Sequence, residues 1–134
     1  MRLDALISKL DAVASSNTLD GVKRRVAVEG LKLIANCFRT TTDPYGVSWP
    51  LLKRPRPGGP VEDKTGAMKG SALAGPIPDG VRFYFGVDYS RFQHWGTLKN
   101  PQRRLLPVAW LGIPPAWKAM ISDAFRGQLR EAMR

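Results

Sequence analysis

The feature that most constrains the fold is the alternation of large apolar residues with polar or small residues over residues 81–88 (VRFYFGVD). A period of two is typical of a β-strand that buries one face. Over residues 89–96 the aromatic residues instead recur at every third position, which favours a helical turn that Gly96 can end. We therefore predict a central strand over 81–88 and an aromatic turn over 89–96. The core residues expected from this stretch are Val81, Phe83, Phe85, Val87, Tyr89, Phe92 and Trp95.

Apolar residues at helical spacing lie on both sides of this stretch. A stripe with the i, i+3, i+4, i+7 pattern predicts an N-terminal helix over about 2–15. Similar stripes predict a second helix over about 19–40 and a last helix over about 115–133. Gly30 lies inside the second helix, where glycine costs about 1 kcal/mol relative to alanine. We interpret Gly30 either as allowing another backbone to come close or as simply tolerated.

The remaining segments read as loops. Residues 41–80 are rich in proline and glycine, but large apolar residues near their start are atypical of a disordered linker. This range is therefore expected to be ordered at first and mobile over 53–64, and long loops of this kind are usually functional or ordered on assembly. A polar, basic loop follows the aromatic turn over 97–104.

A chain of 134 residues is long enough for one domain and too short for two comfortable ones. We predict a single α+β domain over residues 1–134. Two N-terminal helices and a C-terminal helix would pack on a small, mainly antiparallel sheet, with long Pro/Gly-rich loops between them.

The residue types that usually carry catalysis are isolated in this sequence. Cys37 is the only cysteine and lies on an apolar helical stripe, which favours a small buried residue over a reactive thiol. His94 is the only histidine, and no Cys, Asp or Glu is spaced around it as a metal site requires. Glycine-rich phosphate-binding motifs are absent. The sequence therefore predicts that the chain is not an enzyme and has no cofactor or metal.

The charge of the chain is strongly basic and uneven. The formal net charge is +10, and residues 21–60 carry eight Lys or Arg against two acidic residues. Such a balance favours a polyanionic neighbour or an acidic protein partner. No motif that reads bases is present, so any DNA contact would be non-specific and sensitive to salt. No apolar run approaches the length that crosses a bilayer, and no membrane partner is expected.

Three segments stand out together by their order and spacing. They are residues 43–53 (DPYGVSWPLLK), residues 89–97 (YSRFQHWGT), and residues 103–107 (RRLLP) with the Leu111-Gly112 pair that follows. Together they resemble the phage virion morphogenesis family, whose members are also described as tail-completion proteins. The family is similar in having a D-P-x-G-x-x-W-x-x-L-K segment, then Y-A-x-x-H-Q-x-G, then an R-x-x-L-type segment. Here Gln93-His94 reverses the family's usual His-Gln order.

The resemblance implies a structural virion protein that is assembled in the host cytoplasm. Such proteins form closed rings, often hexamers, at the head–tail junction or tail end, as neck, tail-completion or tail-terminator proteins. The implied role is to dock the tail to the head connector while DNA passes through the lumen. The implied partners are further copies of the chain, neighbouring neck, connector or tail-tube proteins, and DNA in non-specific contact.

Two sets of residues are expected to serve this role. Large apolar residues of the Pro-rich loop would pack on a neighbouring subunit; they are Tyr45, Val47, Trp49, Leu51 and Leu52. Basic loop residues would face the lumen or an acidic partner; they are Arg54, Arg56, Lys99, Arg103 and Arg104. Two alternatives remain open: the apolar loop can fold back on its own core, and the chain can be a monomeric basic domain that binds DNA non-specifically.

Overall fold

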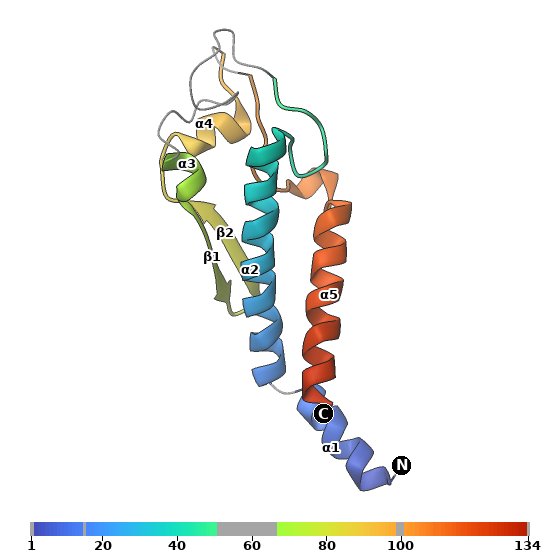
Figure 1. Cartoon of the computed structure of the whole chain (residues 1–134). Helices are drawn as coiled ribbons and strands as arrows, with labels where there is room; N and C mark the ends of the chain where they lie inside the picture. The colour runs from blue at the N-terminus through green and yellow to red at the C-terminus, as the bar shows by residue number, and fades with distance from the viewer. Residues whose placement is uncertain (1, 15, 51–66, 99–100, 134) are drawn as a thin grey trace.

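The computed structural model describes residues 2–14, 16–50, 67–98 and 101–133. Within these residues the chain has an α+β fold of helices and one antiparallel pair of strands (Figure 1). In chain order the elements are α1 (Leu3–Ala14), α2 (Ser16–Thr40), α3 (Ala67–Gly70), β1 (Ala72–Ile77), β2 (Gly80–Phe85), α4 (Ser90–Trp95), the 3-10 helix η1 (Ala109–Leu111) and α5 (Pro115–Ala132). None of the helices in the described ranges combines the length and the apolar character needed to cross a membrane.

The long helix α2 is the axis of the molecule. Helix α5 runs beside it, and the β1–β2 hairpin packs along it on another side (Figure 1). The hairpin is antiparallel, with Ala72 opposite Phe85 and Ile77 opposite Gly80. The short helices α3 and α4 gather at one end of α2, together with the loop segments that follow α2 and α4. Helix α1 projects from the opposite end (Figure 1).

The core lies along α2, because this helix buries residues against both the hairpin and α5. Most of its members come from α2, from the loop after it and from α5. They are Val22, Val26, Ile34, Cys37, Phe38, Trp49, Met68, Leu105, Trp117, Met120 and Ala124. The residues of the predicted strand, Val81, Phe83, Phe85 and Val87, are partly buried and pack against this cluster.

Gly30 of α2 lies beside Phe83 of the hairpin and Trp117 of α5. The rings of Phe83 and Trp117 meet edge to face with centroids 5.0 Å apart. A methyl group at Gly30 would overlap the ring of Phe83. Glycine therefore makes room here for an aromatic side chain and not for a second backbone.

Three predictions about the middle of the chain are wrong. The central strand ends at Phe85 and not at 88, because its partner β1 begins at Ala72 and the chain turns beyond this pair, with Gly86 donating to the carbonyl of Ser71 at 3.0 Å. Residues 41–80, predicted as loop, contain strand β1. Its Pro76 lacks an N–H but is tolerated because β1 has a free outer edge in the described hairpin.

The third correction concerns the aromatic turn. Residues 90–95 do form helix α4, but Tyr89, Phe92 and Trp95 are exposed and not core residues. The side chain that α4 buries is Gln93. The buried face of this helix is therefore selected by a polar contact, described below, and not by its aromatic residues.

Candidate interaction surface

The three segments singled out in the sequence meet at one end of the molecule, which we call the head end (residues 41–50, 90–98 and 101–113). The first of them is a tight loop after α2. Both the backbone N–H of Tyr45 (2.9 Å) and that of Val47 (2.8 Å) donate to Oδ1 of buried Asp43. The backbone N–H of Trp49 donates to the carbonyl of Thr41 at 2.8 Å, which closes the loop. An aspartate that accepts from N–H groups two and four residues ahead stabilises such a turn.

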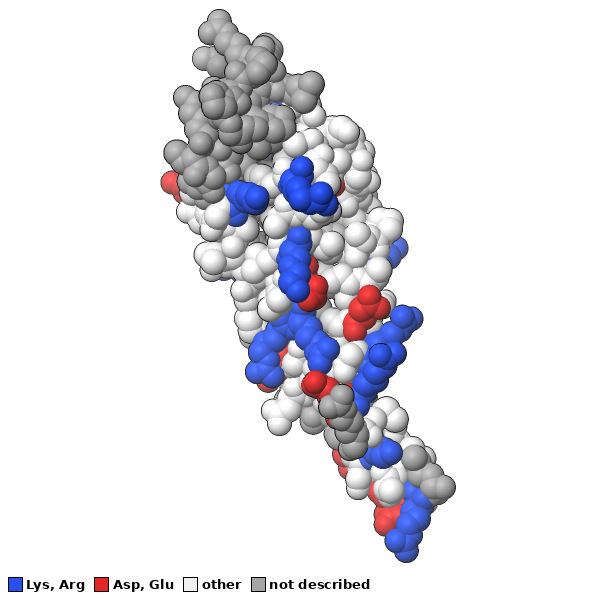
Figure 2. All heavy atoms as spheres, viewed as in Figure 1, with Lys and Arg blue, Asp and Glu red and all other residues white. Residues whose placement is uncertain are grey.

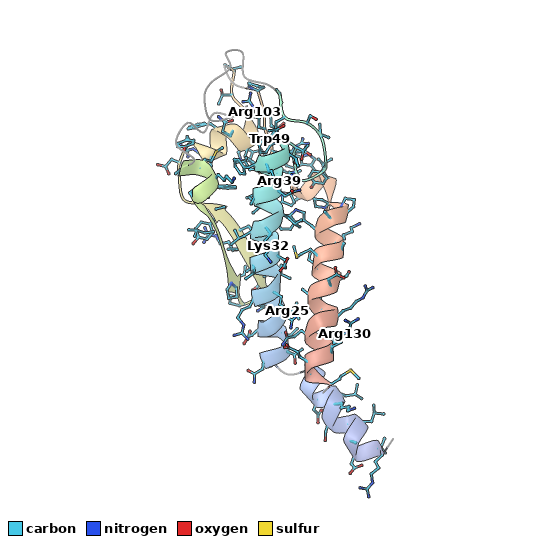
Figure 3. The ribbon with its side chains drawn as sticks, viewed as in Figure 1. Arg25, Lys32, Arg39, Trp49, Arg103 and Arg130 are labelled. Atoms are coloured by element: carbon cyan, nitrogen blue, oxygen red, sulfur yellow. The ribbon has the colours of Figure 1, made fainter. Side chains whose placement is uncertain are left out.

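Arg103 connects all three segments from inside. Its side chain is buried, and its Nε donates to the carbonyl of Pro50 at 2.9 Å. Its Nη1 lies 3.4 Å from Oε1 of buried Gln93, and its backbone N–H donates to the carbonyl of Gln93 at 2.7 Å. Figure 3 shows Arg103 close to Trp49 at the head end. The expectation that Arg103 faces a lumen or a partner is therefore wrong, because its donors are used within the chain.

Trp49 and Tyr45 also make contacts within the chain. Trp49 is buried, packs edge to face on Phe38 with ring centroids 5.4 Å apart, and donates its indole N–H to the carbonyl of Arg104 at 3.0 Å. The Tyr45 hydroxyl lies 2.6 Å from the carbonyl of Gly112 and accepts the N–H of Val108 at 3.0 Å. The prediction that Trp49 forms a subunit interface is wrong. For Trp49 the alternative of a loop folded back on its own core is confirmed, and Tyr45 is half-buried against residues 108–112 of the same chain.

His94 and Cys37, the single histidine and the single cysteine of the sequence, both lie in surroundings that fit a structural role. Nδ1 of His94 accepts the N–H of Leu105 at 3.1 Å, which requires an unprotonated Nδ1. Burial lowers the pKa of His94, and the positive charge of Arg104 adds to this shift. Burial raises the pKa of Cys37 to about 11, with a smaller contribution from the negative charge of Asp43. A thiol in this state is a poor nucleophile at neutral pH.

The remaining predicted site residues lie in different surroundings. Val47 is exposed on the loop after α2. Arg104 is partly buried, and its Nε has no hydrogen-bond partner among the residues that the structure describes. The other residues of the two predicted sets lie outside the described ranges: Leu51, Leu52, Arg54, Arg56 and Lys99.

A pair of exposed tryptophans marks the apolar surface of the head end. The rings of Trp95 and Trp110 stack with centroids 5.7 Å apart, yet the two residues are 56% and 63% exposed. They border a groove of about 450 Å³ between β2, α4 and the segment 105–110. Leu111 and Ile113, which follow Trp110, are also exposed. We call Trp95, Trp110, Leu111 and Ile113 the tryptophan surface.

Sequence reasoning missed Trp110 as an exposed residue. Residues 109–111 form the 3-10 helix η1, which carries Trp110 on the surface. Pro107 and Gly112 bracket this turn, and Gly112 has a positive φ of 73°. Proline and glycine at such positions are typical of a surface turn, and this signal could have identified the exposed tryptophan.

A second feature of the surface is basic. Arg25, Lys32 and Arg39 follow one another at seven-residue spacing on α2, so they lie along one side of the helix (Figures 2 and 3). Acidic side chains lie among them: Arg25 pairs with Glu131 at 3.1 Å, and Lys32 pairs with Glu29 at 3.0 Å. We call Arg25, Lys32 and Arg39 the basic row; its charge is partly neutralised within the chain.

Comparisons of the chain with family models, with curated proteins and with solved structures find no match in any of the three.

Proposed function

We propose that this chain is a structural phage virion protein that forms a ring at the head–tail junction or tail end. In this role it docks the tail to the head connector, with DNA passing through the lumen, and it carries out no reaction. The observation that carries the proposal is the meeting of three segments far apart in the chain. The residues that resemble the virion morphogenesis family are joined by hydrogen bonds around Arg103.

This arrangement explains why the residues that resemble the family motifs occur together in one sequence. Asp43, Trp49 and Arg103 hold the head end in shape, so they support the surface and do not form it. The contact with other proteins then falls to the tryptophan surface. Exposed tryptophans beside an apolar groove are typical of protein interfaces, where aromatic residues are enriched. A ring requires contacts between unlike surfaces of neighbouring copies, which close after a fixed number of subunits.

The proposal is tested by the molar mass of the purified protein, measured by light scattering at low and high salt. We expect a closed oligomer near six subunits at both salt concentrations, because apolar contacts are not screened by salt. Rings should be visible in negative-stain electron micrographs. Mass spectrometry of virions purified from a host that carries the gene should detect the protein.

Substitution of an exposed tryptophan then identifies the contact. Trp110→Ser should lower the oligomer mass and leave the circular dichroism spectrum unchanged. Val28→Ser is the matched control, because Val28 is also an exposed apolar residue but lies on α2. A single-chain mass at both salts and at all accessible concentrations would contradict a self-assembling ring. An oligomer that survives Trp110→Ser would move the contact away from the tryptophan surface.

A second candidate function is non-specific DNA binding by a monomer. The basic row favours it, since three cations along one side of a helix can follow a phosphate backbone. The ion pairs with Glu29 and Glu131 weaken this candidate, because they reduce the charge available to DNA.

A further inference from the structure

Helix α1 presents an apolar stripe to solvent. Leu3, Leu6, Ile7 and Leu10 share one face of the helix and are between 39% and 71% exposed. The helix has 12 residues, and helices of this length are marginally stable in water without packing partners. It also projects away from the body of the molecule (Figure 1). A stable α1 therefore needs an apolar surface to pack against.

The chain carries such a surface elsewhere. A groove of about 460 Å³ lies between α2, the turn of the β1–β2 hairpin and α5. The apolar side chains from the two helices are Leu19, Val22, Val26, Trp117, Ile121 and Phe125. Leu19 and Phe125 are large and exposed at its sides. We call this feature the arm groove.

The stripe and the arm groove match in length. From Leu3 to Leu10 the stripe advances seven residues along its helix, and the α2 side of the groove also advances seven, from Leu19 to Val26. At about 1.5 Å per residue, both are about 10 Å long. An apolar ridge and an apolar groove of equal length can bury each other along their whole extent.

The edges of the stripe carry charges of opposite sign. Helical spacing places Asp4 and Asp11 along one edge of the stripe, and Arg2 and Lys9 along the other. A helix that lies in a groove with this stripe facing inward directs one edge toward each wall. The walls of the arm groove can therefore select one orientation of the helix by charge.

Charges of both signs lie in or beside the arm groove. Asp79 of the hairpin turn lines it. Exposed Lys118 does not line it, but it follows the lining residue Trp117 on α5. Lys23 also lines the groove, but its ammonium group donates to the carbonyls of Ile77 and Pro78 at 2.9 Å. One orientation of α1 places its basic edge beside Asp79 and its acidic edge beside Lys118.

Helix α1 cannot fill the groove of its own chain. It ends at Ala14 and α2 begins at Ser16, so a single residue separates the two helices. Antiparallel packing of consecutive helices needs a connection of about two to five residues. The stripe and the groove are therefore matched but cannot meet within one chain.

We propose that α1 of one copy docks in the arm groove of a second copy. The donating and accepting surfaces are different, so each copy can give its α1 to one neighbour and receive that of another. The arm groove is lined by the N-terminal half of α2, whereas the tryptophan surface belongs to α4 and to the segment before α5. Helix α4 lies at the C-terminal end of α2 (Figure 1). It holds whether or not the assembly belongs to a virion, so it goes beyond the proposed function.

The test is disulfide cross-linking between two full-length variants, Ile7→Cys on the stripe and Phe125→Cys in the groove. The variants are mixed in equal amounts and oxidised at pH 8, and the product is resolved by non-reducing electrophoresis. Native Cys37 stays in place, because it is buried and its pKa of about 11 keeps it a thiol. We expect a cross-linked dimer in the mixture. Because each variant carries only one new cysteine, a disulfide between the two new cysteines must join two chains.

The control mixture combines Ile7→Cys with Asp123→Cys, an exposed position of α5 that does not line the arm groove. This mixture should form much less cross-linked dimer than the mixture of Ile7→Cys with Phe125→Cys. Equal cross-linking in the two mixtures, or none in either, would overturn the proposal. A dimer formed most readily by Ile7→Cys alone would also overturn it, because it would show that two α1 stripes pair with each other.

A second measurement separates this proposal from the proposed function. Ile7→Asp should lower the oligomer mass measured by light scattering, whereas Ser8→Asp, which adds the same charge to the polar side of α1, should not. A ring in which the Ile7→Cys and Phe125→Cys variants do not cross-link would overturn α1 docking and leave the ring in place. The cross-link in a sample that contains only open dimers would support α1 docking and contradict the ring.

Discussion

Arg103 places a guanidinium group in the interior of the head end. Burial of a charge costs several kcal/mol unless the charge is hydrogen-bonded on most sides. Here the donors are directed at the carbonyl of Pro50 and at the side chain of Gln93. The residue therefore acts as a link between chain segments, and its removal would take a donor from the carbonyl of Pro50 and from the side chain of buried Gln93.

We expect Arg103→Ala to lower the free energy of unfolding by about 2–4 kcal/mol, measured by urea denaturation. Arg103→Lys should not restore it, since one ammonium group cannot reproduce the fork of a guanidinium. Arg91→Ala is the control: Arg91 is exposed, with its guanidinium over the ring of Phe92, and should cost less than about 1 kcal/mol. If the Arg103→Ala protein had normal stability but failed to assemble, this would contradict the structural role and support the original expectation that Arg103 faces a lumen or a partner.

His94 makes stability depend on pH in a defined direction. Its pKa is lowered in the folded chain, mainly by burial and further by Arg104. Below the unfolded value of 6.5 the unfolded chain binds a proton that the folded chain resists. The stability from His94 is therefore fully present above pH 6.5 and is lost as the pH falls toward the folded pKa.

We predict that the free energy of unfolding falls between pH 7.5 and 5.5, by at most about 1.4 kcal/mol per pH unit for one proton. His94→Gln should flatten this dependence, because His94 is the only histidine of the chain. Urea denaturation of both proteins across this range measures the effect. Parallel pH profiles for the two proteins would contradict the role of His94 as the acceptor of the Leu105 N–H.

At the scale of elements, α2 and α5 contain glycines with opposite surroundings. A methyl group at Gly30 would meet the ring of Phe83, which is held in the core by Trp117. A methyl group at Gly127 of α5 would meet only the end of the Arg25 side chain. That end donates to Gln128 at 3.0 Å and pairs with Glu131 at 3.1 Å, but it lies at the surface and can shift, whereas the ring packed against the core cannot.

Gly30→Ala should therefore lower the melting temperature, with a net cost of about 1–2 kcal/mol once overpacking outweighs the gain in helix propensity. Gly127→Ala should leave stability unchanged or raise it by up to about 1 kcal/mol. Thermal unfolding followed by circular dichroism compares the two. Changes of the same sign in both variants would contradict this reading of the helix packing.

The long helices could be predicted because the helical spacing of their apolar residues is visible in the sequence itself. Helices α2 and α5 begin and end within a few residues of the prediction. Helix α4 shows the limit of this signal. Its aromatic residues have helical spacing, but the buried face is the one with Gln93, since Gln93 meets Arg103 from a segment ten residues away. Periodicity predicts that a helix forms. It does not predict which face is buried when a side chain from another segment decides this.

The candidate surface could be predicted only in part, for a related reason. Large apolar residues after α2 were expected to meet another subunit, yet Trp49 packs on Phe38 and Tyr45 bonds to the segment before α5. Burial within a chain and burial between chains require the same residue types. The sequence therefore showed which segments carry large apolar side chains, but not whether those side chains are buried within the chain or exposed on its surface.

At the scale of the whole molecule, the net charge of +10 favours electrostatic attraction of a polyanion such as DNA. The basic row offers three cations, and binding through all three predicts a log–log salt slope of about −3. We expect weak binding of duplex DNA that follows this slope, measured by fluorescence anisotropy in a salt series. Arg39→Ala should reduce the slope by about one, and Lys9→Ala on α1 should not change it. A slope that Arg39→Ala leaves unchanged would exclude the basic row as the DNA contact.

Helix α2 runs without interruption for 25 residues, about 37 Å at 1.5 Å per residue. The tryptophan surface lies near its C-terminal end, and α1 and the arm groove lie toward its N-terminal end (Figure 1). A continuous helix packed against α5 resists bending and compression far better than a loop would. Partners bound at the two proposed contact surfaces would therefore be held at a separation set by the length of one helix.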